Sequence, residues 1–331
     1  MPIFFKNFKM RKYINLLYCN YTFVKLMINA IQNTLAFETT VLHLPSPIER
    51  FYLEGIGFDV KRDDKINEII SGNKWRKLKY IIAFAKQNKY KTLISFGGAF
   101  STHLLALAYA AKHFGLHSVG VVRGDEGFDN SILNACKTYG MNLHFVSRKD
   151  YDNKDECAEL IKKTYPIPLI IEEGGANNNA LKGVAEIVDE IATESPLPYQ
   201  HILLAVGTGT TFAGIQLALR THCNTTTQLH GILCIKTDSQ TFLTTQKLIE
   251  PLRSSEQLHD TFHFGGYAKK NSFLQNFIHD FHVENNNKIQ LEPIYTGKVL
   301  WALKELISQK IIPKNDRILL LHTGGLFYLN Y

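Results

Sequence analysis

The chain has 331 residues, of which 45% are hydrophobic and 20% charged, a composition typical of a globular protein large enough for two domains. Its formal net charge is +7, but residues 1–37 contain five basic residues and no acidic one, so the main body lacks the basic stripe that a nucleic-acid partner requires. The five cysteines form no CxxC pair, which argues against a metal site and a disulfide framework and indicates the reducing cytoplasm.

We expect residues 1–40 to be an N-terminal extension that the fold does not need and that could be disordered. Its apolar run, residues 13–31, is interrupted by three asparagines and Lys25, so it is a poor membrane span. No small-residue cleavage site follows it, which argues against a signal peptide. The acid-free start is also compatible with an organelle transit segment. The interpretation that we favour is an over-long start, with Met27 as the natural beginning.

From residue 41 onward the pattern becomes regular. Residues 44–48 predict an extended segment, because two prolines disfavour helix there, and residues 58–62 predict a short strand. Short apolar segments then alternate with amphipathic ones. We expect strands at 92–96, 118–122, 143–146, 169–171, 201–206, 229–235 and 318–322, and helices at 101–114, 130–139, 154–164, 180–191 and 211–220. This alternation predicts an α/β fold with parallel sheets covered by helices.

Lys74 stands at the start of a further predicted helix. A Gly-Asn turn precedes it, and apolar residues then recur at helical spacing from Trp75 to Ala85. The first turn of a helix carries partial positive charge, which lowers the pKa of an amine held there, and a neutral amine is what attack on a carbonyl requires. Taken alone, a solvent-facing lysine is the better interpretation of this position.

Four glycine-marked loops follow predicted strands, at residues 95–103, 172–177, 207–211 and 322–325. In open α/β sheets, ligands lie beyond the carboxyl ends of the strands, next to helix N-termini. For any one loop alone, ordinary helix capping is the better explanation, and Ser101 would be the N-cap in the first of them.

The third loop has the composition of a phosphate cradle. It consists of Gly207, Thr208, Gly209, Thr210 and Thr211, so its backbone N–H groups and hydroxyls can bind a phosphate without a cation. It is not a Walker loop, since Gly-Lys-Thr is missing, and it lacks the last glycine of a dinucleotide fingerprint. A cradle for one phosphate, a lysine at a helix start and several glycine-lined strand ends together indicate pyridoxal 5′-phosphate.

The sequence resembles the 1-aminocyclopropane-1-carboxylate deaminase/D-cysteine desulfhydrase family. This family belongs to the fold type II pyridoxal-phosphate enzymes, relatives of tryptophan synthase β. The resemblance covers residues 41–326 and rests on eight motifs in order: SGNKWRKL (71–78), SFGGAFSTH (95–103), VVRG (121–124), EEGGAN (172–177), VGTGTTFAG (206–214), HFGGYAK (263–269), EPIYTGK (292–298) and LLHTGG (320–325).

The resemblance implies the domains and the site residues. Residues 41–77 and 186–331 would form a large cofactor-binding domain and residues 78–185 a small one, with the cofactor in the cleft between them. Lys74 would be the Schiff-base lysine. Ser101, Tyr267 and Tyr295 would be catalytic beside it; Thr102, residues 207–211, Thr296 and Thr323 would contact the cofactor, and Ser101, Thr102 and His103 the substrate.

Thr296 distinguishes two activities within the family. Deaminases carry Tyr-Glu-Gly-Lys here, and the glutamate keeps the pyridine nitrogen protonated, whereas this chain has a neutral threonine that favours a less demanding β-elimination. Two departures from the family stand beside this match. Thr102 replaces an asparagine that contacts the cofactor's 3-oxygen, and bulky Phe327 and Tyr328 stand near the C-terminus.

The resemblance therefore implies a cytoplasmic homodimeric lyase that acts on a small amino acid, without a membrane or nucleic-acid partner. Its reaction would be the α,β-elimination of D-cysteine, or a related amino acid, to pyruvate, ammonia and sulfide. One alternative is a 1-aminocyclopropane-1-carboxylate deaminase, and another is a pyridoxal-phosphate-binding regulator that has lost catalysis. A nucleotide-binding module is poorly supported, because no loop carries the ribose-binding acid of a proper fingerprint.

Overall fold

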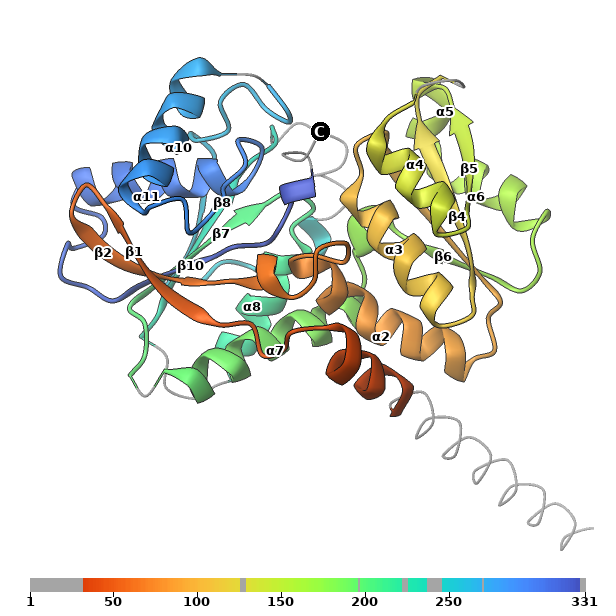
Figure 1. The fold of residues 1–331 in the computed structure, drawn as a ribbon, viewed down its shortest axis with the longest axis horizontal. Coiled ribbons are helices and arrows are strands. Elements are labelled where there is room, and N and C mark those ends of the chain that lie inside the picture. The colour runs from red at the N-terminus through yellow and green to blue at the C-terminus, as the bar shows by residue number, and fades with distance from the viewer. Residues whose placement is uncertain are drawn as a thin grey trace, which may run out of the picture.

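The computed structural model describes residues 32–125, 129–195, 197–221, 226–236, 246–269 and 271–327. Within these ranges the chain forms two lobes, each built on its own sheet, with helices α2 (Asn73–Gln87) and α7 (Asn178–Glu194) along the edge where the lobes meet (Figure 1). The predicted α/β class is confirmed.

The larger sheet has six strands in the order β1-β2-β10-β7-β8-β9. β1 and β2 pair antiparallel, and the remaining neighbours pair parallel. The strands are β1 (Ile48–Leu53), β2 (Ile56–Lys61), β7 (His201–Val206), β8 (Gln228–Leu233), β9 (Glu256–His259) and β10 (Ile318–Leu321). Apolar side chains of α10 (Ser272–Glu284) and α11 (Thr296–Ser308) cover one face, and those of α7 and α8 (Thr210–Thr221) cover the other.

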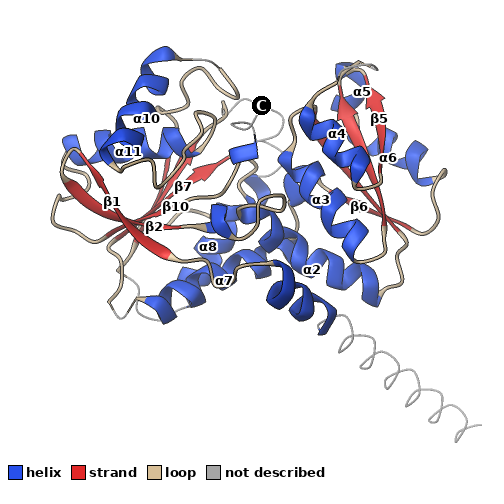
Figure 2. Cartoon of the chain, in the orientation of Figure 1, coloured by secondary structure: helices blue, strands red, loops and turns tan. Residues whose placement is uncertain are grey.

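The smaller sheet has four parallel strands in the order β5-β4-β3-β6. They are β3 (Thr92–Gly98), β4 (His117–Arg123), β5 (Met141–Val146) and β6 (Pro168–Ile171), and Figure 2 shows helices on both sides of them. One face packs against α2, α3 (Thr102–His113) and α4 (Ser131–Thr138). The other packs against α5 (Arg148–Asp152) and α6 (Lys154–Lys162).

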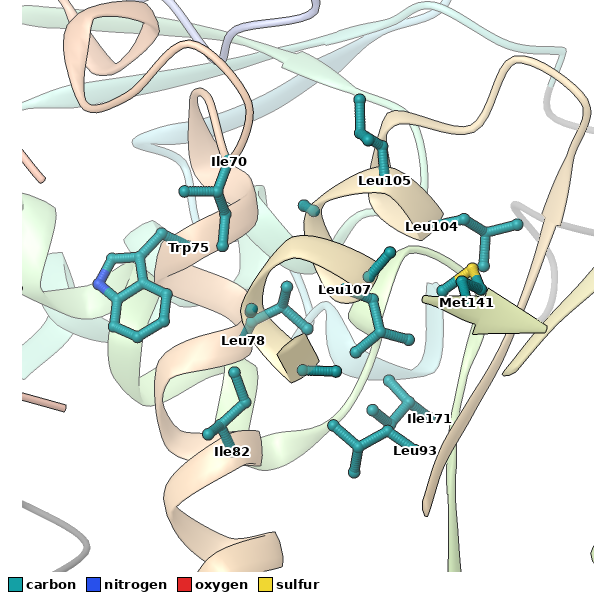
Figure 3. Close-up of a cluster of buried hydrophobic side chains, with 14 of the residues drawn as sticks. Ile70, Trp75, Leu78, Ile82, Leu93, Leu104, Leu105, Leu107, Met141 and Ile171 are labelled. Carbon is teal, nitrogen blue, oxygen red and sulfur yellow. The ribbon is translucent and has the colours of Figure 1, made fainter. Parts of the chain in front are cut away.

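The core beneath the smaller sheet fixes the start of α2. Figure 3 shows Trp75, Leu78 and Ile82 on this helix beside the leucines of α3. These side chains are fully or almost fully buried, so the apolar face that the sequence predicts for α2 is confirmed. The face holds the helix, and with it Lys74 in the first turn, at the junction of the two sheets.

Buried ion pairs join α2 to the larger lobe. The guanidinium of Arg76 donates two hydrogen bonds of 2.7 Å to Asp63, which follows β2, and two more, of 2.8 and 2.9 Å, to Glu190 of α7. At Gly183 of α7, a Cβ would lie 2.0 Å from the carbonyl oxygen of Arg76, so only glycine permits this helix contact. The junction is therefore a close-packed one.

Several details differ from the sequence-based expectations. Residues 32–41 are helical, and Phe37 is buried against Trp75, so part of the expected extension contributes to the core; residues 1–31 lie outside the described ranges. The segment expected to be merely extended continues into β1, and β9, α5, α10 and α11 had no counterpart in the prediction. The domain limits at residues 77/78 and 185/186 stay a prediction. None of the described helices is both long and apolar enough to cross a bilayer.

Candidate active site

A cavity of about 520 Å³ lies beyond the carboxyl ends of strands from both sheets. The loops after β3, β6, β7 and β10 all contribute to it, which are the four glycine-marked loops of the sequence. Nine of the predicted site residues line the cavity: Lys74, Ser101, Thr102, His103, Gly207, Thr208, Tyr267, Tyr295 and Thr323. The structure thus brings together residues that are up to 250 positions apart in the chain.

Lys74 lies in the first turn of α2, as predicted, and its amine faces the cavity. Burial lowers the pKa of this amine to about 8, against the opposing attraction of the Glu292 carboxylate. The direction agrees with the sequence-based argument, but the main physical cause is desolvation rather than the helix dipole. A substantial fraction of this amine is neutral near physiological pH.

Asn73 connects the lysine to the glycine–threonine loop. Lys74 Nζ donates to Asn73 Oδ1 at 2.6 Å, and Asn73 Nδ2 donates to Thr211 Oγ1 at 2.8 Å. The backbone N–H of Asn73 also donates to the carbonyl oxygen of Thr323, over 3.2 Å. One asparagine therefore fixes the amine relative to both the β7–α8 loop and the loop after β10.

The β7–α8 loop turns directly from a fully buried strand into a helix. Gly207 and Thr208 line the cavity, and the hydroxyls of Thr208 and Thr210 are 3.2 Å apart. Gly209, Thr210 and Thr211 are not among the lining residues, although they surround the N-terminus of α8. The N-terminus and the hydroxyls retain the character of an anion cradle.

Lys77 is a second buried amine in the cavity. The sequence alone did not identify it as a site residue. It lies one helical turn beyond Lys74 on the same face. Burial, and to a smaller extent repulsion from Lys74, lowers its pKa to about 7. The only available signal was its spacing of three residues from Lys74. Lys77 thus adds a partly protonated amine to the cavity, whereas the glycine–threonine loop contains no basic residue.

His103 is a neutral hydrogen-bond acceptor in the cavity. The hydroxyl of Ser95 donates to the carbonyl oxygen of Ile171, so His103 Nε2, 3.0 Å from that hydroxyl, is the donor to it. His103 Nδ1 is therefore unprotonated, and this buried atom has no hydrogen-bond partner. Burial, with repulsion from Lys77 and Lys74, lowers the pKa of His103 to about 3.

Ser101 caps α3, as the structural interpretation of this residue predicts, because its Oγ accepts a hydrogen bond of 3.3 Å from the N–H of Leu104. It also lines the cavity together with Thr102, the first residue of the helix. The two hydroxyls and the N-terminus of α3 face the same space as Lys74. This edge of the smaller sheet is suited to binding a carboxylate.

Tyr267 and Tyr295 form the opposite wall. Their ring centroids are 6.2 Å apart, and Tyr267 is 44% exposed, so its ring stands at the mouth rather than inside a core. At Gly207, a Cβ would lie 3.2 Å from the Tyr295 ring, which leaves no room for a larger residue there. Both tyrosines line the cavity, and their catalytic roles stay a prediction.

Thr296 does not line the cavity, contrary to the expectation that it contacts the cofactor. It is fully buried, and its hydroxyl lies 3.1 Å from Glu292 Oε1, whose carboxylate also accepts the N–H groups of Ile294, Tyr295 and Thr296. Burial raises the pKa of Glu292 despite these bonds. A Cβ at Gly325, a lining residue, would lie 3.7 Å from the same Oε1. A carboxylate is thus close to the cavity although residue 296 is neutral.

The mouth of the cavity carries cations that sequence reasoning missed. Arg123 is the last residue of β4, Lys236 lies in the segment after β8, and Lys269 lies in the loop before α10. All three are exposed lining residues. Glu173 is the acidic lining residue, and it pairs with Lys154 at 2.6 Å. Their separation in the chain concealed this cluster, because only the tertiary fold places the four loops together.

Comparison with known proteins connects this geometry to a family. The pattern of the family described as "Pyridoxal-phosphate dependent enzyme" matches residues 38–264. The chain is 31% identical over 303 residues to a Pyrococcus horikoshii protein named "Putative 1-aminocyclopropane-1-carboxylate deaminase", covering 88% of this chain and 90% of that protein. It is 28% identical over 323 residues to the "Bifunctional D-cysteine desulfhydrase/1-aminocyclopropane-1-carboxylate deaminase, mitochondrial" of Arabidopsis thaliana, covering 88% and 78%.

Solved structures agree with this assignment. The structure described as an "ACC deaminase homologue" superposes with a TM-score of 0.72 at 27% identity, covering 90% of this chain and 97% of that one. A pyridoxal 5′-phosphate-dependent aspartate racemase superposes with a TM-score of 0.64 at 15% identity, which shows a shared fold alone. The predicted fold type is therefore confirmed.

Proposed function

We propose that this chain, which belongs to the 1-aminocyclopropane-1-carboxylate deaminase/D-cysteine desulfhydrase family of pyridoxal-phosphate-dependent enzymes, catalyses the α,β-elimination of D-cysteine or a closely related amino acid. D-cysteine and water would yield pyruvate, ammonia and hydrogen sulfide. The observation that carries the proposal is the partly neutral amine of Lys74, which shares one cavity with the Ser101 hydroxyl and the two tyrosine rings.

Pyridoxal phosphate is the cofactor of this family, and the residues of the cavity fit it. Lys74 offers an amine for its aldehyde, while the β7–α8 loop and Lys77 offer an anion site for its phosphate. The unpartnered Nδ1 of buried His103 is an acceptor that a bound donor would satisfy. When bound, the cofactor supplies an electron sink for negative charge that develops at the substrate's α-carbon.

The chain's own residues would bind the substrate and move its protons. The Ser101 and Thr102 hydroxyls, at the positive end of α3, bind the α-carboxylate and turn the α-hydrogen toward Lys74. Lys74 Nζ takes the α-proton, since an amine with a pKa of about 8 is an effective base near neutral pH. Its hydrogen bond to Asn73 holds it in place for this transfer.

The two tyrosines would act on the departing sulfur. Tyr295 lies against Gly207, and the phenol of such a residue can donate a proton to a leaving thiolate. Tyr267 lies farther out, where it covers the mouth and limits access of water. We assign the protonation to Tyr295 and the covering role to Tyr267.

Deamination of 1-aminocyclopropane-1-carboxylate is the second candidate. Both activities occur in the name of the plant relative, and the buried carboxylate of Glu292 lies behind Gly325 at the edge of the cavity. A carboxylate at this depth can supply what the family's deaminases obtain from a glutamate at the position of Thr296. The neutral Thr296 by itself therefore favours desulfhydration less strongly than the sequence indicates.

The test is to incubate the purified holoprotein separately with D-cysteine and with 1-aminocyclopropane-1-carboxylate. We expect sulfide and pyruvate from the first in equal amounts, and no product in the variant Lys74→Ala. Release of 2-oxobutanoate from the second compound, with no sulfide from D-cysteine, would reverse the ranking. Absence of any product from both compounds, in a protein that is yellow with cofactor, would refute catalysis of either reaction.

A further inference from the structure

The charged residues around the cavity are unequally divided. Five basic side chains line it, two of them the partly neutral amines of Lys74 and Lys77, against one acidic side chain among the described residues. The acid, Glu173, is already neutralised by Lys154 at 2.6 Å. A cavity with so large a positive excess attracts anions, and the low-dielectric walls strengthen the attraction.

The proposed function, on which this inference rests, uses two of the five cations. Lys74 is assigned to the cofactor aldehyde, and Lys77, a lining residue one helical turn away, is assigned to the cofactor phosphate. The substrate's α-carboxylate has its own site at the N-terminus of α3. Arg123, Lys236 and Lys269 remain, and none of these three forms an ion pair with an acidic side chain in the part of the chain that the structure describes.

The two lysines are placed by a shared support. Lys236 Cγ lies 3.4 Å from where a Cβ of Gly266 would be, and Lys269 Cγ lies 3.6 Å from where a Cβ of Gly265 would be, so both stems pack against one turn of backbone. The fully buried amine of Lys298 donates to the carbonyl oxygens of Cys234 and Gly266, at 2.9 and 3.0 Å.

Lys298 therefore joins two backbone segments by hydrogen bonds. One is the end of β8, which precedes Lys236, and the other is the turn that precedes Lys269. The guanidinium of Arg123 approaches from the smaller sheet, 5.5 Å from the centre of the Tyr151 ring that supports it. Cations that follow strands of both sheets thus line one cavity. The stems of the two lysines and the guanidinium of Arg123 each pack against a defined neighbour, unlike scattered surface lysines.

We infer that the preferred substrates are α-amino acids whose β-substituent carries a negative charge of its own, which Arg123, Lys236 and Lys269 bind. The α-carboxylate would lie at the start of α3 and the charged substituent at the cationic mouth. Carboxylate, sulfate and phosphate groups share the required chemistry. A neutral thiol or a cyclopropane ring makes no use of the three cations.

Binding of a matched pair of ligands tests this inference without requiring elimination. Aspartate and asparagine are nearly isosteric and differ by the charge of the β-substituent. Calorimetric titration of the holoprotein with each, in both enantiomers, should show aspartate binding at least tenfold more tightly in one enantiomeric series. Raising the salt concentration to 0.5 M should reduce the ratio, because screening weakens exposed charge pairs.

The double variant Lys236→Met/Lys269→Met should lower the aspartate-to-asparagine ratio about tenfold, since each exposed pair contributes up to about fivefold. The matched control Lys163→Met/Lys314→Met removes two exposed lysines outside the cavity and should leave the ratio unchanged. Equal affinities for the two ligands, or a ratio that both double variants reduce alike, would overturn the inference. Sulfide release from D-cysteine tests the proposed function separately, so a failure of the inference can be distinguished from a failure of the proposed function.

Discussion

The substitution Gly72→Ala tests how the start of α2 is held against the end of β10. Gly72 has a φ of +66°, and a Cβ there would lie 1.9 Å from the carbonyl oxygen of Thr323, where contacts under 3.0 Å are essentially never found. Alanine must therefore adopt a φ of 66° with a ψ of −146°, a backbone region that is essentially restricted to glycine and costs about 1–3 kcal/mol. The start of α2 must also move away from Thr323 by more than 1 Å, because the distance of 1.9 Å has to increase to at least 3.0 Å.

The separation breaks the hydrogen bond from the N–H of Asn73 to Thr323, worth about 0.5–1.5 kcal/mol, and disturbs packing around it. We expect a total loss of about 3 kcal/mol or more. The control is Gly115→Ala, because Gly115 also has a positive φ, of +64°, but no atom within 4 Å of its Cβ position. This control carries the backbone strain alone, about 1–2 kcal/mol.

Thermal unfolding of the two variants measures the difference. At about 2 °C per kcal/mol for a chain of this size, Gly115→Ala should lower the Tm by about 2–4 °C and Gly72→Ala by about 6 °C or more. Gly72→Ala should also bind pyridoxal phosphate more weakly, because Asn73 and Lys74 follow directly in the helix. Equal Tm changes in the two variants, with unchanged cofactor affinity in both, would refute the close approach as the reason for glycine at residue 72.

Three further predictions follow from buried charges. The rate at which the apoprotein forms its covalent bond with pyridoxal phosphate should rise with pH, with a midpoint at about 8, as Lys74 loses its proton. Glu292→Gln should move this midpoint to lower pH, because the carboxylate raises the pKa of Lys74, and a midpoint near the ordinary lysine value of 10.5 would contradict burial of the amine. Burial lowers the pKa of His230 to about 3, so the folded state does not take up the proton that the unfolded chain binds below about pH 6.5. Urea unfolding should therefore show that the free energy of unfolding falls by about 2 kcal/mol between pH 7 and pH 5. If His230→Gln shows the same fall, another group causes it. Arg76→Met removes the cationic partner of buried Asp63 and one of the two cations that pair with partly buried Glu190, and should cost about 3–5 kcal/mol. Arg50→Met removes a pair whose arginine is 53% exposed and should cost about 1 kcal/mol at most, and the same urea measurement compares the two.

The sequence was most informative where local chemistry and local structure coincide. Alternating apolar and amphipathic segments predicted the parallel strands, and the glycine-marked loops predicted which strand ends carry the site. The position of Lys74 in the first turn of a helix was also predictable. These features depend on residues within one turn or one strand of each other, so spacing alone reports them. The direction of the Lys74 pKa shift was predicted from the helix start, but its main cause is burial.

The remaining features depend on contacts between distant segments. β1 was missed because its partner across the hairpin, rather than its own pattern, makes it a strand. The sequence did not show that the hydroxyl of Thr296 lies 3.1 Å from Oε1 of Glu292, four residues earlier, nor that Thr296 is absent from the cavity lining. Its contact with the cofactor stays a prediction. Lys77 gave no signal among neighbouring lysines, because burial by other segments is what distinguishes it.

The two sides of the cavity differ in how they are held, and this difference separates their functions. Lys74, Asn73 and Thr211 form a continuous hydrogen-bonded line, so the amine and the cradle move as one unit. The residues proposed to bind the substrate include Ser101 and Arg123, which come from the smaller sheet and share no hydrogen bond with that line among the described contacts. Substitution of Asn73 should therefore weaken cofactor binding for every substrate alike. Substitution of Arg123 should instead change which amino acids bind while leaving the affinity for pyridoxal phosphate within about fivefold, the limit of exposed charge effects. An equal loss of affinity for pyridoxal phosphate in both variants would show that the two sides of the cavity are coupled.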